Sequence, residues 1–265
     1  MQIELAHSHV SDGLVHEPTM PHMLLRQWEK LKLKLRAEKY LYKEDRGGIA
    51  YIKKEVNQGH TVFDIGAHKA GYLYFFLEQL EGNGMVYAFE PQAPLHSYLL
   101  KLQQLFRWKN LCIESFAVSD HAGKAVLGIP YNKGQRTSPC ATIVNNNFFS
   151  SAQTYQEVNT VCLDDYCSSK GIVPDFLKVD VEGNELAVFK GAENILRKYR
   201  PKILFECEAR FVGKEKVGDT LSFLSSLGYE GSFIIGDSRK PISEFDLSMH
   251  QSQNKTVYCN NFIFE

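Results

Sequence analysis

Short apolar runs alternate with longer, helix-length segments over most of the chain. Apolar runs at 61–65 and 85–89 are each followed by such a segment, at 72–80 and 94–106. Short runs bounded by turn residues predict strands, and apolar residues three or four positions apart predict helices. This order predicts βαβ units, in which helices cover both faces of a parallel sheet.

The same alternation returns in the second half of the chain. Further strands are predicted at 111–118, 158–161, 176–181 and 202–207, further helices at 163–170, 184–198 and 217–227, and β-rich segments at 231–235 and 256–264. Because crossovers between parallel strands are right-handed, the carboxyl ends of these strands open on one edge of the sheet. No repeat or linker interrupts the pattern, so we expect one α/β domain over 61–265.

Residues 130–151 break this alternation and predict a long loop. The loop contains Tyr131, Arg136 and the run Asn145-Asn146-Asn147. Loops longer than about 15 residues in compact domains are usually lids, binding loops or disordered segments. Both a lid over a polar acceptor and a disordered insert explain it.

The first sixty residues follow another pattern, which predicts an added N-terminal arm with helices. The segment 1–20 has no periodicity, and helices are predicted at 24–42 and 48–57. Between Arg26 and Lys43 there are seven Lys or Arg and two Glu. A solvated helix face is the simpler explanation of these charges, and binding to an anionic partner is the alternative.

Composition narrows the classes of protein that fit. The chain has 265 residues, 30 basic and 31 acidic side chains and 44% apolar residues, enough for a core without metals or disulfides. The near-zero net charge argues against a general nucleic-acid coat. The sequence contains no apolar run near the ~20 residues of a membrane span and no secretory signal. Six cysteines without a Cys-x-x-Cys pair are typical of reduced thiols. We therefore expect a cytoplasmic protein without a metal site, with the oligomeric state, a homo-oligomer included, left open.

The first strand ends in a turn that suits a nucleoside. Asp64 precedes Gly66, where a missing Cβ lets a ligand approach the backbone, and Glu90 follows the next strand. In α/β folds an acid at that second position binds ribose hydroxyls. A structural glycine turn with a capping Asp64, and an exposed acid ending a strand at Glu90, are the alternatives. Neither a dinucleotide fingerprint nor a P-loop is present, so the pattern points to an adenosyl group without phosphates, as in S-adenosylmethionine.

Acidic residues also follow the later strands. Asp180 and Glu182 lie on one side of their strand end, and Glu206 and Glu208 lie at the end of the next strand. Such carboxylates could supply a general base, hold a hard cation or bind substrate hydroxyls. The structural alternative is that Glu182 and Glu185 stabilise the N-terminus of the following helix.

At these residues the sequence resembles the FkbM family of S-adenosylmethionine-dependent methyltransferases. The matching segments are 63–67, 88–91, 117–120, 163–165, 177–185, 189–192, 200–206 and 260–262. The resemblance implies a Rossmann-like class I methyltransferase with a seven-stranded, mostly parallel sheet, helices on both faces and an antiparallel last strand. The first sixty residues lie outside it.

The resemblance also implies which residues bind the donor. The turn from Asp64 to Gly66 and Glu90 would hold it, with Ser119 and Asp120 near the adenine. The family's usual turn has Asn, one residue and then Gly, whereas here His68-Lys69-Ala70 precede a glycine that comes one residue late. His68 could therefore contact either the methionine end of the donor or the substrate. The full expected cofactor site is Asp64, Gly66, Ala67, His68, Gly71, Glu90, Ser119, Asp120 and Asp180.

We expect O-methylation of a hydroxyl on a small molecule such as a sugar, a glycan or a secondary metabolite. Asp180 is the first candidate for the base, followed by Glu182, Glu206 and His68. A non-catalytic S-adenosylmethionine-binding module is the main alternative. A nicotinamide oxidoreductase would share the sheet, but the phosphate-binding turn that it needs is missing.

Overall fold

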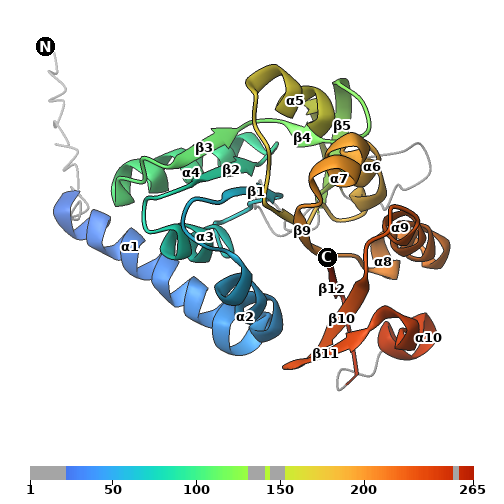
Figure 1. Ribbon diagram of the computed structural model, residues 1–265. Helices are drawn as coiled ribbons and strands as arrows, with labels where there is room; N and C mark the ends of the chain where they lie inside the picture. Colours follow the sequence, from blue (N-terminus) through green and yellow to red (C-terminus); the bar gives the residue numbers. More distant parts are fainter. Residues whose placement is uncertain (1–21, 131–140, 144–152, 253–256) are drawn as a thin grey trace, which may run out of the picture.

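The centre of the molecule is a twisted sheet with helices on both faces (Figure 1). The computed structural model describes residues 22–130, 141–143, 153–252 and 257–265. In these residues the main sheet has eight strands in the order β11-β10-β12-β9-β8-β1-β2-β3. Their bounds are β1 Thr61–Ile65, β2 Met85–Phe89, β3 Leu111–Glu114, β8 Phe176–Val179, β9 Lys202–Glu206, β10 Gly231–Ile235, β11 Ser238–Pro241 and β12 Asn261–Phe264.

The expected parallel sheet with an antiparallel last strand is confirmed. Strands β3, β2, β1, β8 and β9 pair in parallel, and β12 is antiparallel to both β9 and β10. An eighth strand, β11, extends the expected seven by pairing with β10 at the sheet edge. The carboxyl ends of β1, β2, β8 and β9 therefore share one edge.

Alternate strand residues bury opposite faces of the sheet under different helices. Val62 faces a core formed with α1 (His22–Lys39), α2 (Arg46–Glu55), α3 (Leu73–Leu80) and α4 (Ala93–Phe106). Phe63 faces the other core, formed with α5 (Leu163–Lys170), α6 (Glu185–Lys190), α7 (Glu193–Tyr199) and α9 (Lys214–Ser226). Among the described helices, none is long and apolar enough to cross a membrane.

The N-terminal helices are packed onto this domain. Leu33 and Ala37 of α1 and Ile49 of α2 are buried in the same core as Val62. Between them the chain forms a π-helical turn, η1 (Tyr40–Glu44), which periodicity alone did not predict. Asp45 then begins α2 by accepting a hydrogen bond from the Gly48 backbone N–H at 2.9 Å.

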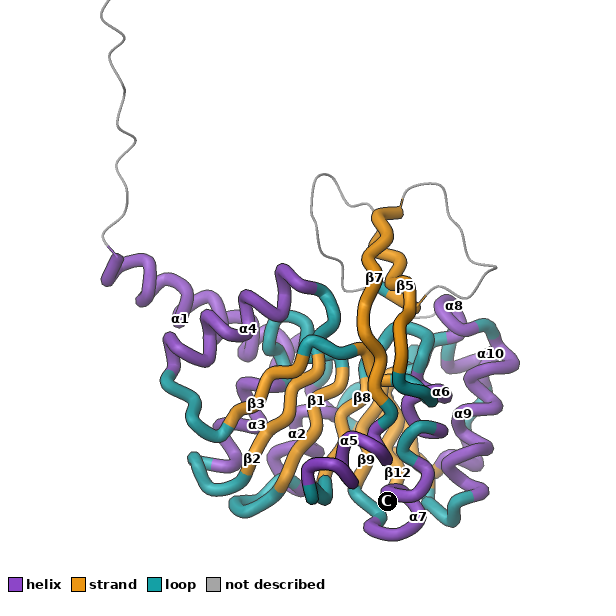
Figure 2. Tube along the Cα trace, turned by 90° about the horizontal axis from the view of Figure 1, so that it is seen from above, coloured by secondary structure: helices purple, strands orange, loops and turns teal. Residues whose placement is uncertain are grey.

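A second, smaller sheet stands over the carboxyl edge of the main one (Figure 2). It has the order β4-β7-β5-β6, with β4 Ala117–Val118, β5 Gly123–Pro130, β6 Thr142–Ile143 and β7 Gln153–Val161. Strand β5, which was not predicted, pairs with β7 over its whole length. Most of the predicted loop 130–151, including Tyr131, Arg136 and Asn145 to Asn147, lies outside the described residues.

Several element boundaries differ from the sequence expectation. The predicted strand 111–118 is divided between β3 and β4, which belong to different sheets. The predicted helix 184–198 is two helices, α6 and α7, separated at Gly191 and Ala192. Short helices α8 (Ala209–Val212) and α10 (Leu247–His250) and the 3-10 turn η2 (Ile242–Glu244) complete the described fold.

The break at Gly191 brings two backbones into contact, which gives a stability prediction. An added Cβ at Gly191 would lie 2.2 Å from the carbonyl oxygen of Ser119, so Gly191→Ala must displace backbone. We expect a loss of about 1–3 kcal/mol in the free energy of unfolding, measured by urea denaturation. The matched control is Gly218→Ala in α9, where no atom lies within 4 Å of the added Cβ. That change should raise the free energy of unfolding by about 0.5–1 kcal/mol. Equal losses in both variants would contradict the close contact between Gly191 and the Ser119 carbonyl oxygen.

Candidate functional site

The turn after β1 joins the ends of three strands. Gly66 has φ +88°, and an added Cβ would lie 1.9 Å from the carbonyl oxygen of Asp180. The backbone N–H groups of Gly66 and Ala67 donate to the carbonyl oxygen of Phe89 at 3.0 and 3.1 Å. The Asp180 N–H donates to the carbonyl oxygen of Ile65 at 2.9 Å. A residue without a side chain is therefore required where β1, β2 and β8 end.

The next residues show where the unusual turn sequence is accommodated. His68 and Ala70 both have left-handed backbone, with φ +45° and +65°, a conformation that costs a non-glycine residue about 1–3 kcal/mol. Both left-handed positions therefore precede Gly71, which agrees with a glycine that comes one residue late. Gly71 meets a different constraint, because an added Cβ would lie 2.8 Å from the ring of Tyr40.

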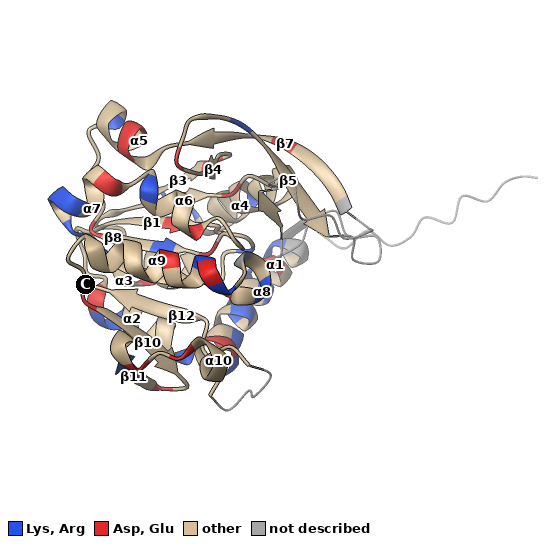
Figure 3. Ribbon diagram, turned by 90° about the vertical axis from the view of Figure 1, so that its right-hand side faces the viewer, with Lys and Arg blue, Asp and Glu red and all other residues tan. Residues whose placement is uncertain are grey.

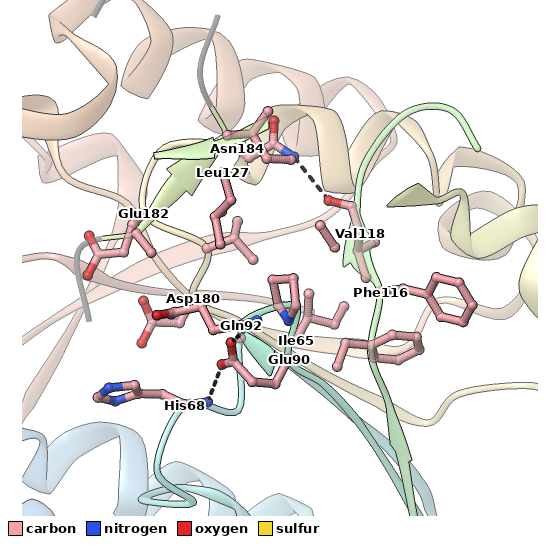
Figure 4. A pocket seen from close by; sticks show the side chains of 17 residues that line it. Ile65, His68, Glu90, Gln92, Phe116, Val118, Leu127, Asp180, Glu182 and Asn184 are labelled. Atoms are coloured by element: carbon pink, nitrogen blue, oxygen red, sulfur yellow. Dashed lines mark hydrogen bonds between the residues drawn. The ribbon is translucent and has the colours of Figure 1, made fainter. Parts of the chain in front are cut away.

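Glu90 is held in one orientation at the end of β2. Its two carboxylate oxygens accept hydrogen bonds from the backbone N–H groups of His68 and Gln92, each at 2.9 Å (Figure 4). Burial raises the pKa of Glu90 to about 7, against the lowering effect of these two bonds. A carboxylate can accept further hydrogen bonds beyond these two, so Glu90 can still bind hydroxyl groups.

A mostly apolar cavity opens beside Glu90. Its walls come from strand ends of the main sheet and from the small sheet: Ile65, Gly66, His68, Phe89, Glu90, Pro91, Gln92, Phe116, Ala117, Val118, Leu127, Ala141, Ile143, Asp180, Val181, Glu182 and Asn184. Asp180, Glu182 and His68 lie on one side, whereas Phe116 lies at the other end (Figure 4). Such a cavity fits a flat apolar ring joined to a polar group.

A second cavity is polar. Its lining residues are Tyr40, Glu44, Asp45, Gly66, Ala67, His68, Gly71, Tyr72, Asp180, Glu182, Glu206, Asn260 and Asn261. The two cavities share Gly66, His68, Asp180 and Glu182. These four residues therefore mark the place where contents of the two cavities would meet.

A buried lysine lies beneath this meeting point. The Lys178 side chain is fully buried, with Nζ 3.7 Å from Asp180 Oδ2 and 4.4 Å from the centre of the Tyr72 ring. Asp64 pairs in register with Lys178 on the neighbouring strand and is also buried, lining neither cavity. Burial raises the pKa of Asp64 to about 7, and the nearby Lys178 ammonium opposes that rise. Lys178 thus offsets part of the negative charge of an acid-rich region.

Burial changes the acid–base properties of the other candidate residues. It raises the pKa of Glu182 to about 8 and that of Glu206 well above its ordinary value, and repulsion from Asp180 adds to both shifts. Glu206 accepts a hydrogen bond from the Asn260 amide. Burial also lowers the pKa of His68 to about 4, so its imidazole is neutral near pH 7. His68 Nε2 is buried and has no hydrogen-bond partner among the described residues.

Most of the residues proposed from the sequence lie together. Gly66, Ala67, His68, Gly71, Glu90, Asp180, Glu182 and Glu206 each line at least one of the two cavities. Ser119 and Asp120 line neither. Ser119 is buried next to Val118, and Asp120 is a surface residue whose carboxylate lies 2.6 Å from His121 Nδ1. In the described part of the chain, no three His, Cys, Asp or Glu side chains are grouped so as to hold a metal ion.

Sequence reasoning missed two parts of the site. In the apolar wall, Leu127 lies on β5, whose pattern did not predict a strand, and Phe116 lies in the unpredicted break between β3 and β4. Tyr40 and Asp45 come from the N-terminal segment, which carries no motif. The pair Asn260-Asn261 was visible as part of the family resemblance but had been given no role.

Comparison with known proteins identifies the family. The family model described as "Methyltransferase FkbM domain" matches residues 64–230. The chain belongs to the FkbM methyltransferase family. This FkbM domain gives no match among curated proteins.

One solved structure supports the fold, and two others serve for comparison. Methyltransferase FkbM from Methylobacillus flagellatus KT is 14% identical to this chain, with a TM-score of 0.51. The match covers 92% of this chain and 60% of the M. flagellatus chain, so this chain spans about three fifths of that protein's length. An O-methyltransferase from Bacillus cereus in complex with SAH is 10% identical over 94% of this chain and 92% of that one, with a TM-score of 0.48. Aeropyrum pernix fibrillarin with bound S-adenosyl-L-methionine is 12% identical over 82% of this chain and 72% of the fibrillarin chain, with a TM-score of 0.47.

The family match describes a methyltransferase domain, and the sequence predicts S-adenosylmethionine as its methyl donor. The residues present fit that donor. The apolar cavity can take the adenine, the oriented Glu90 carboxylate suits the ribose, and the shared carboxylates suit a cationic sulfonium. The cavity holds no phosphate-binding loop, as expected for a nucleoside without phosphates.

The buried acid Glu185, outside both cavities, gives a pH prediction for the FkbM domain. Burial raises its pKa from 4.5 to about 7, although its carboxylate accepts a hydrogen bond from Gly183 at 2.8 Å. At pH values between 4.5 and about 7, Glu185 keeps its proton in the folded chain but has lost it in the unfolded chain. The contribution of Glu185 to stability therefore falls as pH rises. Glu185→Gln removes the titration and can keep the bond from Gly183.

We therefore expect the stability of Glu185→Gln relative to the parent to increase by roughly 1–3 kcal/mol from pH 5 to pH 8. Urea unfolding at several pH values measures it. A difference that stays constant with pH would show that Glu185 is ionised in the folded chain.

Proposed function

We propose that this FkbM domain transfers the methyl group of S-adenosylmethionine to a hydroxyl group of a small molecule or glycan. One observation carries the proposal: the apolar cavity and the acid-lined cavity meet at Gly66, His68, Asp180 and Glu182. A donor in the first cavity and an acceptor in the second would have their reacting ends side by side. Such placement can contribute about 7–11 kcal/mol to lowering the barrier.

In this proposal the donor extends from the small sheet to the β1 turn. Phe116, Val118 and Leu127 would enclose the adenine, and Glu90 would accept hydrogen bonds from the ribose hydroxyls. Gly66, Ala67, His68 and Gly71 would surround the methionine end, where the unpartnered Nε2 of His68 can bond a polar group. Ser119 and Asp120 line neither cavity, so they would act only through their neighbour Val118, which lines the apolar cavity. Asn184 holds Val118 by donating to its carbonyl oxygen at 3.0 Å. Asp64 would not touch the donor and would act only through its charge interaction with Lys178, which in turn contacts Asp180.

The acceptor would bind in the polar cavity. Carboxylates and amides such as Glu206, Asn260 and Asn261 suit the many hydroxyls of a sugar. Tyr40 and Asp45 would form the wall opposite the donor, so the N-terminal segment 1–60 would complete a site whose chemistry belongs to 61–265. The polar lining favours a hydroxylated acceptor over an apolar one.

The donor supplies an electrophilic methyl group, so the chain must remove a proton from the acceptor. Asp180 is the proposed base, because it lines both cavities and Lys178 orients its carboxylate. Glu182, with a pKa raised to about 8 by burial, is the next candidate and becomes mostly ionised only above about pH 8. Glu206, with a pKa raised well above its usual range, and His68, with a pKa lowered to about 4 by burial, are less suited at neutral pH.

We also propose a reducing compartment, the cytoplasm, for this protein. The described cysteines Cys112, Cys162, Cys167, Cys207 and Cys259 are all free thiols, which supports that assignment.

The test of the function uses Asp180→Asn with labelled donor and a panel of sugars, glycans and hydroxylated metabolites. We expect mass spectrometry to detect O-methylated product with the parent, and a kcat about 10²–10⁴-fold lower with the variant. Donor affinity, measured by calorimetry, should change only a few-fold. The exposed Asp219→Asn on α9 is the control and should keep parental kcat.

Two results would count against this account. Unchanged turnover of Asp180→Asn across the pH range would show that Asp180 is not the base. Tight donor binding without product from any acceptor would favour the non-catalytic binding module.

A further inference from the structure

The N-terminal helix α1 has apolar side chains on two opposite faces. Leu33 and Ala37 are buried against the core. Leu24, Trp28, Leu31 and Leu35 are instead between 45% and 52% exposed. At about 100° per residue these four lie within about 60° of one another, on the side of the helix away from Leu33. We call these four residues the outer stripe.

The outer stripe is unusual for a helix that is packed on a domain. Single exposed apolar residues are ordinary, but such a helix normally presents a polar face outward. Here the outward face has a tryptophan and three leucines in a row over three turns. In Figure 1, α1 is the outermost helix on its side of the molecule. Covering this stripe would remove apolar surface from water.

Basic side chains flank the outer stripe on both sides. Lys32 and Lys39 lie about 50–70° to one side of its centre and Lys34 about 90° to the other, and all three are exposed. The exposed acid Glu38 lies about 50° from the centre on the Lys34 side. Over His22–Lys39 there are six Lys or Arg and two Glu, a net charge of +4. Lys and Arg recur along α1 in Figure 3. Of the two acids, Glu29 is paired with Lys32 at 3.3 Å and lies 3.8 Å from Lys101.

We propose that the outer stripe of α1 binds the surface of an anionic lipid bilayer. An apolar stripe containing Trp, with lysines at its borders, is the pattern of a helix that lies in the bilayer interface. The lysines can extend to lipid phosphates while the stripe enters the acyl boundary. A second copy of this chain fits less well, because pairing two stripes would bring their basic borders together.

Binding at α1 leaves the methyl-transfer site intact. Arg36, on the inner part of the helix, donates to the carbonyl oxygen of Lys69 at 2.6 Å and to the Tyr98 hydroxyl at 3.3 Å. The first bond holds α1 to the turn that contains His68, and the second holds it to α4. The outer stripe can therefore enter the interface without displacing a residue that lines either cavity.

The test is co-sedimentation of the full chain with phosphatidylcholine vesicles, with and without phosphatidylglycerol. We expect binding to the anionic vesicles that weakens as salt is raised. Trp28→Ser/Leu31→Ser should reduce it at least about tenfold without changing activity. The matched control is Tyr199→Ser, an exposed aromatic residue at the end of α7. Lys34→Glu should weaken binding to anionic vesicles, whereas Lys216→Glu on α9 should have less effect.

Fluorescence gives an independent readout. The chain has two tryptophans, so Trp108→Phe leaves Trp28 as the only one, and its emission should shift to the blue on adding anionic vesicles. Four results would overturn the proposal, the first three of which concern the full chain. These three are no binding to anionic vesicles, equal binding by the outer-stripe variant, and self-association of the parent that the outer-stripe variant abolishes. Binding that appears only after residues 1–21 are removed would also overturn it, because that segment would then be the occupant of the stripe.

Discussion

The close approach of two strand ends at Gly66 is the constraint on which the site depends. No side chain can stand at residue 66, because its Cβ would lie 1.9 Å from the Asp180 carbonyl oxygen. The backbone there also pairs with Phe89 through two hydrogen bonds. As a result the polar groups that follow three different strands converge. Glu90, fixed by the His68 N–H, lies on one side of the Gly66 turn, and Asp180 lies on the other side. A donor binding to one is then necessarily close to the other.

Buried charge gives the two halves of the site different properties. Carboxylates crowd the polar cavity, and burial together with Asp180 raises the pKa of Glu182 and Glu206. Lys178, fully buried under the Tyr72 ring, is the cation beneath them. A positively charged sulfonium would add a second positive charge to this acid-rich region, which favours the donor over its uncharged product. In the apolar cavity, by contrast, binding is favoured because the apolar surface of a flat ring is removed from water.

Local sequence patterns predicted the strands and the convergence of their ends, because parallel strands place their carboxyl ends on one edge. Glu90 and Asp180 could therefore be proposed together from spacing alone. The patterns could not predict Phe116 and Leu127 as a wall, because that depends on pairing between β5 and β7 across a long insert. Nor could they predict Tyr40, which reaches the site only through packing of an N-terminal segment against Gly71. Such contacts between distant segments leave no local periodicity.

The most direct test is a crystal structure of the full chain with S-adenosylhomocysteine, the donor without its methyl group. The account predicts the adenine between Phe116 and Leu127, the ribose hydroxyls within hydrogen-bond distance of the Glu90 carboxylate, and the sulfur facing the Asp180 side of the polar cavity. A ligand bound elsewhere, or bound in this cavity with its ribose turned away from Glu90, would contradict it.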